Sequence, residues 1–371
     1  MKIILAGGGT GGHINPALSV ADYIRKIHPD AEIRFVGTKR GLEKRLVPAA
    51  GYPIDYIDIC GFDRRRLWRN FGVLIKLFKA NRDCVKLMKE FCPDAVVCTG
   101  GYVSGPVAVA AKRAGVPALI HEQNVYPGLT VKGSQRYVDY VAVSFEETVD
   151  YLEQKEKCVV TGNPVRSAIL EADAQKAREK LGLSEKPFVL VFGGSLGAEV
   201  LNRTMLGMMQ KLVSEAKVQL LFGTGERNYE AVTEELRKMG ISFNDEVRVV
   251  PYIDNMADVM AAADLVVARS GAITVSEIAA LGKASILIPS PNVVRNHQEQ
   301  NARAFEKQDA AVVITEDVLT PELLYEKITG LAENPRHLKQ MGNNVQKLAK
   351  RNALAEIYNL IDKMVKNSQN K

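Results

Sequence analysis

A glycine-rich segment near the start of the chain ends in a histidine. The segment GGGTGGH at residues 7–13 follows an apolar run at residues 1–6, and a helical pattern begins near Asn15. A strand, a glycine loop and a helix in this order can hold an anion, because glycines let the backbone approach a phosphate and the first helical N–H groups point towards it. His13 lies at the edge of this loop, and the pKa of an unperturbed histidine is near neutrality. The sequence therefore predicts a phosphate loop with a titratable side chain beside it.

Two later segments repeat this design. The apolar run 188–192 leads into GGSLGA at 193–198, and the run 264–268 leads into RSGAITVSE at 269–277. We expect a second phosphate loop, in which the Ser195 hydroxyl donates a hydrogen bond. In the third segment, Thr274 and Glu277 have the spacing of a capping box. The other interpretation is a helix start directed at a diphosphate, with Glu277 accepting hydrogen bonds from ribose hydroxyls. The two interpretations do not exclude each other.

Two polar clusters follow predicted strands. His121-Glu122-Gln123-Asn124 comes after the apolar residues 118–120, and the segment NHQEQN at 296–301 comes after the run 286–288 and a proline turn. Polar side chains at the carboxyl end of a strand are where ligand contacts concentrate. The first cluster combines an imidazole, a carboxylate and two amides. A solvated loop explains the second cluster equally well.

The first loop also fits a dinucleotide-binding protein in part. Gly7, Gly9 and Gly12 satisfy the pattern G-x-G-x-x-G. A nicotinamide site also needs an acidic residue at the end of the second strand, where it holds the ribose. The predicted second strand is followed by Lys39 and Arg40 instead. The sequence therefore disfavours NAD and leaves NADP open.

The second loop also fits a hydrolase in part. Ser195 lies in a G-x-S-x-G pattern, and candidate acids and His297 follow in the chain order of an α/β-hydrolase. A hydrolase would not explain the first glycine loop, whereas a second phosphate loop explains both. The sequence contains no G-x-x-x-x-G-K-[ST] and no Asp-x-Asp pair that could hold a metal on a diphosphate.

The elements that carry these loops alternate between strand and helix patterns. Predicted strands at 32–37, 53–59, 95–99, 118–121 and 140–144 indicate βαβ units and a parallel sheet. The pattern pauses at Gly162-Asn163-Pro164 and restarts with the apolar run at 188. We therefore expect an α/β chain of two doubly wound domains that face each other across a cleft, with ligands at the carboxyl ends of the strands. The expected domains are 1–163, 164–345 and a C-terminal helix, 346–371, that packs back on the first domain.

Composition narrows the class of protein. The chain has 371 residues, of which 46% are hydrophobic, and this length favours two domains. Its five cysteines form no C-x-x-C pair, which is typical of reduced thiols in a cytosolic protein. No signal peptide is visible, and no stretch reaches the roughly 18 apolar residues of a membrane span. The net charge of +6 suits an anionic partner.

One basic segment carries an apolar stripe. Residues 64–89 hold nine basic side chains and a single acid, Asp83. Four apolar side chains fall on one face of the predicted helix: Leu67, Phe71, Leu74 and Phe78. An ordinary amphipathic helix with a solvated basic side explains this pattern. A peripheral membrane contact also explains it, because apolar side chains enter the interface while basic ones meet anionic lipid. Nucleic acid is disfavoured, since no known reader motif accompanies the charge.

Taken together, the motifs resemble the MurG family. The motifs that carry the resemblance are GGGTGGH with NPA at 15–17, GGYVSGP at 100–106, HEQN at 121–124, GNPVR at 162–166, GGSLGA at 193–198 and residues 270–277. They occur in order and cover residue 1 to about residue 315. Members of this family move N-acetylglucosamine (GlcNAc) from UDP-GlcNAc to the membrane-bound precursor lipid I. The product is lipid II, which serves peptidoglycan synthesis, cell shape and cell division.

The resemblance implies a fold and a site. It implies a GT-B fold of two Rossmann-like domains, an inverting hexosyltransferase without cofactor or essential metal, and a donor held mostly by the second domain. The residues that it places at the donor are Thr10, Gly11, Gly12, Asn124, Arg166, Ser195, Ile253, Ala272, Ile273, Thr274, Val275, Ser276, Glu277 and Gln298. Within this set, the backbone of Ile253 is expected at uracil, Glu277 at the ribose hydroxyls, and Gln298 at the sugar. Arg166 and Ser195 are expected near the phosphates.

The implied chemistry needs a base. The muramyl 4-hydroxyl must lose its proton as it attacks the anomeric carbon, and UDP must leave with its charge stabilised. His13 is the first candidate for the base and Glu122 the second, while Asn124 is expected to face the GlcNAc. His13 could instead orient the acceptor diphosphate. N–H groups at the phosphate loops would stabilise the leaving group.

The resemblance also implies a location and partners. Because lipid I is membrane-bound, the enzyme is expected to dock peripherally on the cytoplasmic face of the cell membrane, with residues 67–79 as the contact. Its expected partners are UDP-GlcNAc, lipid I, the anionic membrane surface and other proteins of cell-wall synthesis and division, but no nucleic acid. Two other functions stay open from the sequence. One is an NADP-dependent oxidoreductase, and the other is a non-catalytic scaffold that binds a nucleotide sugar.

Overall fold

The computed structural model describes residues 1–61, 70–194, 197–241 and 246–369. The chain divides into two compact units. Unit 1 comprises Met1–Val165 and Lys350–Lys371, and unit 2 comprises Arg166–Ala349. The sequence placed these boundaries after residues 163 and 345. Each unit is a parallel α/β structure with its own core.

Among the described residues, unit 1 contains a seven-stranded parallel sheet in the order β3-β2-β1-β4-β5-β6-β7. Its strands are β1 (Lys2–Ala6), β2 (Glu32–Gly37), β3 (Ile54–Tyr56), β4 (Ala95–Cys98), β5 (Ala118–Glu122), β6 (Tyr140–Val143) and β7 (Cys158–Val160). Its helices are α1 (Gly11–Ile27), α2 (Glu43–Ala49), α3 (Asn70–Phe91), α4 (Gly101–Ala114), α5 (Leu129–Ser134) and α15 (Ala353–Gln369). The sequence analysis missed β7, a three-residue strand at the edge of the sheet.

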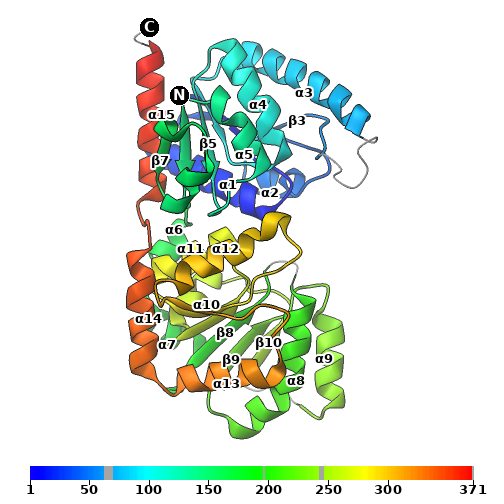
Figure 1. Ribbon diagram of the computed structural model, residues 1–371, viewed down its shortest axis with the longest axis vertical. Coiled ribbons are helices and arrows are strands. Elements are labelled where there is room, and N and C mark those ends of the chain that lie inside the picture. The colour runs from blue at the N-terminus through cyan, green and yellow to red at the C-terminus, as the bar shows by residue number, and fades with distance from the viewer. Residues whose placement is uncertain (62–69, 195–196, 242–245, 370–371) are drawn as a thin grey trace. The chain divides into compact units, whose positions relative to one another are not determined.

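Alternate residues of each strand point to opposite faces of this sheet, and each face has its own helices. Ile4 and Ala6 of β1 join the core cluster beneath α3 and α4, whereas Ile3 and Leu5 join the cluster beneath α1 and α15. This explains why central strands such as β1 and β4 carry runs of apolar residues without alternation, since both of their faces are buried. Figure 1 shows these helices around the strands of unit 1.

Among the described residues, unit 2 contains a six-stranded parallel sheet in the order β10-β9-β8-β11-β12-β13. Its strands are β8 (Phe188–Phe192), β9 (Gln219–Gly223), β10 (Val247–Val250), β11 (Leu265–Ala268), β12 (Ala284–Leu287) and β13 (Ala311–Val313). Its helices are α6 (Ser167–Leu170), α7 (Ala174–Leu181), α8 (Glu199–Glu215), α9 (Tyr229–Lys238), α10 (Met256–Ala262), α11 (Ala272–Leu281), α12 (His297–Glu306), α13 (Pro321–Ala332) and α14 (Pro335–Lys347). The helix expected over 166–181 is two helices, because the Asp173 carboxylate accepts from Lys176 N–H and starts α7 anew.

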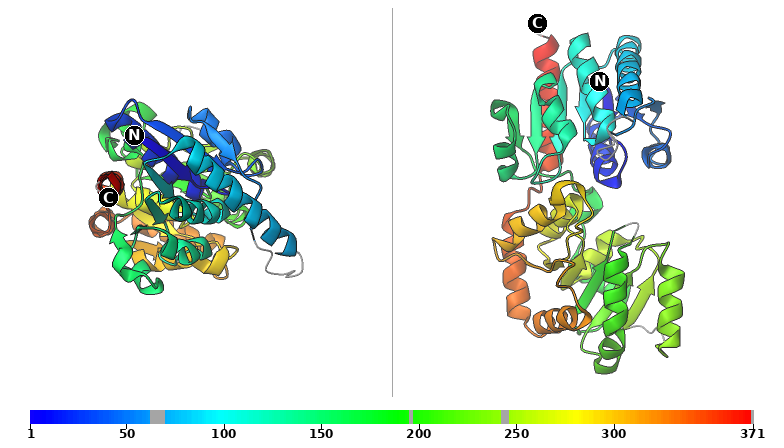
Figure 2. Two further views of the ribbon diagram at one scale, coloured as in Figure 1. Left: turned by 90° about the horizontal axis from the view of Figure 1, so that it is seen from above. Right: turned by 45° about the vertical axis from the view of Figure 1, so that its right-hand side comes forward.

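The last helix of the chain belongs to unit 1. Ile357 and Ile361 of α15 are buried in the cluster that also holds Ile14 and Ile24 of α1. Tyr358 adds a hydrogen bond of 2.7 Å between its hydroxyl and Nε2 of His28. Figure 2 shows α15 beside the strands of unit 1 from two further directions. The chain therefore leaves unit 1 after Val165 and returns to it at Lys350.

The order of the strands fixes where each unit can hold a ligand. In unit 1 the chain builds outward from β1 to β3 and then returns to β4 on the other side of β1, so the two crossovers leave in opposite directions. The same reversal occurs between β8 and β11 in unit 2. Ligands of doubly wound sheets bind at the carboxyl ends of the strands at such a switch point. In the described residues, no helix is long and apolar enough to cross a membrane.

Candidate functional site

The switch point of unit 1 brings His13 against the end of β4. The helix α1 begins at Gly11, inside the glycine loop and earlier than expected, so that His13 lies in its first turn. Thr99, which follows β4, donates from its hydroxyl to the carbonyl oxygen of His13 over 2.7 Å. Gly100 has φ +102°, and a Cβ there would lie 2.7 Å from Nδ1 of His13. Glycine is required at this position because a side chain would occupy the place of the imidazole.

The imidazole of His13 is held through one nitrogen. Its Nδ1 lies 3.1 Å from the carbonyl oxygen of Thr99 and 3.2 Å from Oε1 of Gln123. Both neighbours are oxygens, so Nδ1 is the donor in this arrangement. The ring is half-buried, at the carboxyl ends of β1 and β4. His13 is therefore placed where a base could meet a ligand bound to unit 1.

His121 and Gln123 lie beneath this imidazole and not at the surface. Both side chains are buried, and Nε2 of His121 lies 2.9 Å from the carbonyl oxygen of Gly162. Burial lowers the pKa of His121 to about 4, so its ring is neutral at physiological pH. The expected polar cluster at 121–124 thus contains two residues that support the site from below.

The carboxylate of Glu122 stabilises the turn that follows β5, between Asn124 and Gly128. Its Oε1 accepts from the backbone N–H of Asn124 at 2.9 Å and from Nδ2 of the same residue at 3.1 Å. Its Oε2 accepts from the backbone N–H of Gly128 at 2.7 Å. Burial raises the pKa of Glu122, while these hydrogen bonds lower it. The carboxylate is 2% exposed and therefore fixes the position of Asn124 at the carboxyl end of β5.

Sequence analysis missed Glu43, which supports the first glycine loop. Its side chain is fully buried, and it accepts from the Thr38 hydroxyl at 2.7 Å, the Thr38 N–H at 2.9 Å and the Gly9 N–H at 3.0 Å. A carboxylate therefore occupies one N–H of the loop that was expected to serve a phosphate. No spacing in the sequence marks this residue, because its contact with Gly9 joins the first glycine loop to the start of α2, and the two meet only in the folded unit.

The second glycine loop lies at the switch point of unit 2. Gly194 and Gly197 have φ +90° and +75°, and the N–H of Gly197 donates to the carbonyl oxygen of Gly194 over 3.0 Å. A Cβ on Gly197 would lie 2.2 Å from the carbonyl oxygen of Thr224, so the close approach of this loop to β9 requires glycine. The helix α8 follows directly. Ser195 lies outside the described residues.

The helix after β11 begins at Ala272, with Gly271 as its N-cap. The capping-box interpretation of Thr274 and Glu277 is therefore wrong, because Thr274 lies inside the first turn and caps nothing. The turn is fixed from below by Ser270, which donates from its hydroxyl to the carbonyl oxygen of Gln298 over 2.8 Å. The first N–H groups of α11, among them those of Ala272 and Ile273, lie at the switch point where an anion would bind.

Arg166 and Glu277 form an ion pair inside unit 2. Nε and Nη2 of Arg166 lie 3.2 Å and 2.9 Å from Oε1 of Glu277. The Glu277 side chain is 8% exposed and the Arg166 side chain 53%. Burial raises the pKa of Glu277, and the Arg166 guanidinium lowers it. The two residues expected at the ribose and at the phosphates are thus neighbours, with Arg166 on the solvent side.

Two further donor-site candidates are positioned by the sheet. Gln298 lies in α12, where its Oε1 accepts from the Ser290 N–H over 2.9 Å. Ile253 follows β10 and is 7% exposed; its side chain packs over Gly223 at the end of β9. Val275 is buried in α11, whereas Thr274 and Ser276 are half-buried. Among the described residues, no cluster of three His, Cys, Asp or Glu side chains could hold a metal ion.

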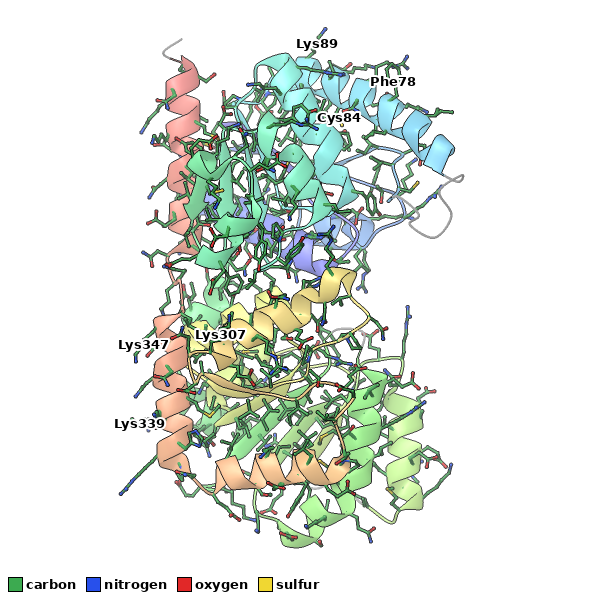
Figure 3. The ribbon with its side chains drawn as sticks, viewed as in Figure 1. Phe78, Cys84, Lys89, Lys307, Lys339 and Lys347 are labelled. Carbon is green, nitrogen blue, oxygen red and sulfur yellow. The ribbon has the colours of Figure 1, made fainter. Side chains whose placement is uncertain are left out.

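The helix α3 presents apolar side chains to solvent. Phe78 is 76% exposed and Ile75 is 61% exposed, while Cys84 and Met88 on the opposite side are buried. Figure 3 shows Phe78 and Lys89 on the outer side of α3 and Cys84 on the side of α4. Leu67 and the side chains of Phe71 and Leu74 lie outside the described residues. Ile75 was not part of the expected stripe.

Comparisons with known proteins follow the division into two units. The sequence matches the glycosyltransferase family 28 N-terminal domain over residues 3–143 and the glycosyltransferase family 28 C-terminal domain over residues 188–357. A relative from Acetivibrio thermocellus is 47% identical over 368 residues, which are 99% of this chain and 99% of the relative. It is named UDP-N-acetylglucosamine--N-acetylmuramyl-(pentapeptide) pyrophosphoryl-undecaprenol N-acetylglucosamine transferase.

Solved structures resemble the chain along its whole length. The crystal structure of Acinetobacter baumannii MurG aligns with a TM-score of 0.77 and 30% identity, covering 98% of this chain and 99% of that one. The UDP-GlcNAc 2-epimerase of Neisseria meningitidis aligns with a TM-score of 0.67 and 14% identity, covering 98% of this chain and 100% of that one. At this identity, the second likeness shows the fold alone.

Proposed function

The chain belongs to glycosyltransferase family 28, and from that membership we propose how its two units divide one reaction. The enzyme transfers GlcNAc from UDP-GlcNAc to lipid I, the undecaprenyl-pyrophosphoryl N-acetylmuramyl-pentapeptide, and so makes lipid II for peptidoglycan. The predicted resemblance, the GT-B fold and the hexosyltransferase activity are thus confirmed. In our proposal, residues 1–163 serve the acceptor and the membrane, and residues 164–345 bind the donor.

The donor binds at the switch point of unit 2. The N–H groups at the start of α8 and α11 face the diphosphate, together with Arg166 and residues 272–276. The resemblance adds Ser195, which lies outside the described residues. Glu277 accepts hydrogen bonds from the ribose hydroxyls through Oε2, because its Oε1 already accepts from Arg166. The ion pair supports this role, since burial raises the pKa of Glu277 and the Arg166 guanidinium acts in the opposite direction, in favour of the carboxylate form. The Ile253 backbone contacts uracil, and Gln298 reaches the sugar through Nε2, because its Oε1 is bound to Ser290 N–H.

The acceptor binds at the switch point of unit 1, with His13 as the general base. The observation that carries this proposal is the contact of Nδ1 with the Thr99 carbonyl and the Gln123 amide, which leaves the lone pair on Nε2. Nε2 takes the proton of the muramyl 4-hydroxyl as its oxygen attacks the anomeric carbon, with inversion.

Glu122 is the second candidate for the base, and its buried hydrogen bonds favour the role of holding Asn124 towards the GlcNAc. From the family resemblance, we propose that Thr10, Gly11 and Gly12 border the donor sugar and diphosphate.

The leaving UDP is stabilised by fixed dipoles and charge. Preorganised N–H groups at helix starts act where negative charge develops and need no rearrangement during the reaction. The glycine loop of unit 2 supplies such groups, and Arg166 supplies a positive charge on the solvent side of Glu277. In the proposed reaction, these groups stabilise the negative charge of the leaving diphosphate in place of a metal ion.

The membrane contact is α3. Its exposed face combines Phe78 and Ile75 with basic side chains, and such a face places apolar groups in the lipid interface while the charges meet anionic headgroups. We therefore propose that the enzyme is a peripheral protein of the cytoplasmic leaflet. Proteins of cell-wall synthesis and division are the expected neighbours there. No nucleic acid is involved in the reaction.

We abandon the hypothesis of an NADP-dependent oxidoreductase, because the chain belongs to a glycosyltransferase family. The scaffold alternative and the transferase differ in one assay. We expect UDP release from UDP-GlcNAc that depends on a short-chain lipid I analogue. Donor binding without such turnover would contradict the assigned reaction.

A further inference from the structure

We propose that Gln123 and His121 are positioning residues that fix the tautomer of His13. The two side chains link the His13 imidazole to the backbone of Gly162 through a chain of hydrogen bonds. The inference rests on the proposed function only for the role of the His13 lone pair in transfer. Its structural part, the tautomer, can be measured without any substrate.

The orientation of the Gln123 amide is determined by its surroundings. Its Nε2 lies 2.8 Å from the Thr99 carbonyl oxygen, 3.3 Å from the His121 carbonyl oxygen and 3.0 Å from Nδ1 of His121. The carbonyl oxygens accept and cannot donate, so the NH₂ group must be on this side of the amide. The side chain is 2% exposed, and leaving these acceptors unpaired would be costly in a buried place. Oε1 therefore faces His13.

The state of His121 follows from the same bonds. Its Nε2 donates to the Gly162 carbonyl oxygen over 2.9 Å, and its Nδ1 accepts from Gln123. A protonated ring would carry a hydrogen on Nδ1 as well, opposite the NH₂ group of Gln123. The low pKa of His121, about 4, prevents this clash, because burial disfavours the charged ring. His121 thus acts as a neutral, oriented acceptor.

The consequence for His13 is a single tautomer. Nδ1 meets two oxygen acceptors, from Thr99 and Gln123, so the neutral ring carries its hydrogen on Nδ1 and its lone pair on Nε2. An imidazole with the opposite tautomer would place the lone pair of Nδ1 against these two oxygens and could not accept a proton through Nε2. The buried pair His121 and Gln123 therefore decides which nitrogen of His13 is the base.

The experiment uses the full chain, labelled with ¹⁵N in its five histidines. The ring nitrogen shifts report which nitrogen carries the hydrogen, and His13→Ala identifies the signals of His13. In the wild type we expect the Nδ1–H form. In Gln123→Met, which has a similar length and no acceptor, we expect a mixture of both forms. In Gln123→Glu, which keeps an acceptor opposite Nδ1, we expect the Nδ1–H form again.

Kinetics provide the second measurement. Gln123→Met should lower kcat about tenfold, the effect of about one neutral hydrogen bond, and should change the KM for UDP-GlcNAc less than twofold. Observation of the Nε2–H form of His13 in the wild-type protein would by itself overturn the proposal. So would an unchanged Nδ1–H form in a folded Gln123→Met protein. A changed tautomer with unchanged kcat supports the positioning role and instead removes His13 as the base.

Discussion

Nη2 of Arg166 lies 2.9 Å from Oε1 of Glu277, although the two residues are 111 positions apart in the sequence. Arg166 is the first residue of unit 2, so the chain enters this unit directly at its proposed donor site. The pair combines a buried carboxylate with an exposed guanidinium. In the proposed donor site, this pair would connect the ribose end of the donor to its diphosphate.

Loss of Glu277 should weaken donor binding. A hydrogen bond to a charged group contributes about 1.5–3 kcal/mol, so Glu277→Ala is expected to raise the KM for UDP-GlcNAc about 10–100-fold. Donor titrations at saturating acceptor would measure this. The matched control is Glu234→Ala, which removes the carboxylate of the exposed Arg237–Glu234 pair of α9 in the same unit. Equal KM values for Glu277→Ala and the control would contradict the ribose assignment.

Loss of His13 should affect turnover and leave donor binding intact. A general base contributes about 10²–10⁴ in rate, so His13→Ala should lower kcat by at least about 10²-fold while the affinity for UDP is retained. His337→Ala is the control, because His337 is an exposed histidine of α14. UDP release and UDP binding would be measured on the same preparations. A loss below tenfold would transfer the role to Glu122 or to water.

Loss of the exposed apolar pair on α3 should weaken membrane binding. The double change Ile75→Ser and Phe78→Ser removes side chains that are 61% and 76% exposed, so it should leave the fold intact. We expect about tenfold weaker binding to vesicles that contain anionic lipid, because each apolar group that enters the interface adds favourable transfer energy. Val318→Ser is the control, since Val318 is 52% exposed in unit 2. Binding equal to that of the control would place the contact elsewhere.

Loss of the Glu43 charge should destabilise unit 1. In Glu43→Gln, the new NH₂ group must face one of the N–H groups of Thr38 and Gly9, which leaves a buried donor without an acceptor. The expected cost is about 1–3 kcal/mol in the free energy of unfolding. Glu32→Gln, at a side chain that is 61% exposed, is expected to change it by less than about 0.5 kcal/mol. Urea denaturation would compare the two variants.

The buried imidazole of His121 should make unit 1 sensitive to acid. Its pKa falls from 6.5 in the unfolded chain to about 4 in the folded protein. A depressed histidine pKa contributes stability that is fully present above pH 6.5 and is lost as the pH falls towards 4. The shift corresponds to about 3 kcal/mol. In His121→Asn, whose amide oxygen can still accept from Gln123, the free energy of unfolding should fall less between pH 7 and pH 4. Parallel curves for both proteins would show that His121 does not titrate in this range.

The repeated order of strand, glycine loop and helix could be predicted from the sequence because it is marked by two local patterns, an apolar run and the glycines that follow it. Apolar strands such as 188–192 and the glycines that follow them need no knowledge of the rest of the chain. The same reasoning found His13 and Glu277, whose residue types suggest chemistry at strand ends. It placed His121 and Glu122 at the site by their position, and the structure shows that both are buried beneath it.

The contacts that sequence reasoning missed are long-range. Glu43 reaches Gly9 over 34 positions, and Gln123 reaches His13 over 110. No pattern along the chain records such pairs, because the parallel sheet brings them together only when its strands pair. The helix start at Gly11 was placed too late for a related reason. Glycines seldom favour helices, and here the loop is held by Glu43, which overrides the local preference.

The discontinuity of unit 1 has a consequence for synthesis on the ribosome. Unit 2 is one continuous segment, so it can fold as soon as Ala349 has emerged. Unit 1 cannot, because Ile357 and Ile361 fill its core against α1 and are synthesised after the whole of unit 2. Until α15 has been synthesised, the apolar face of unit 1 that this helix covers stays exposed. The proposed catalytic histidine therefore belongs to a unit that begins before unit 2 in the sequence and is completed only after it.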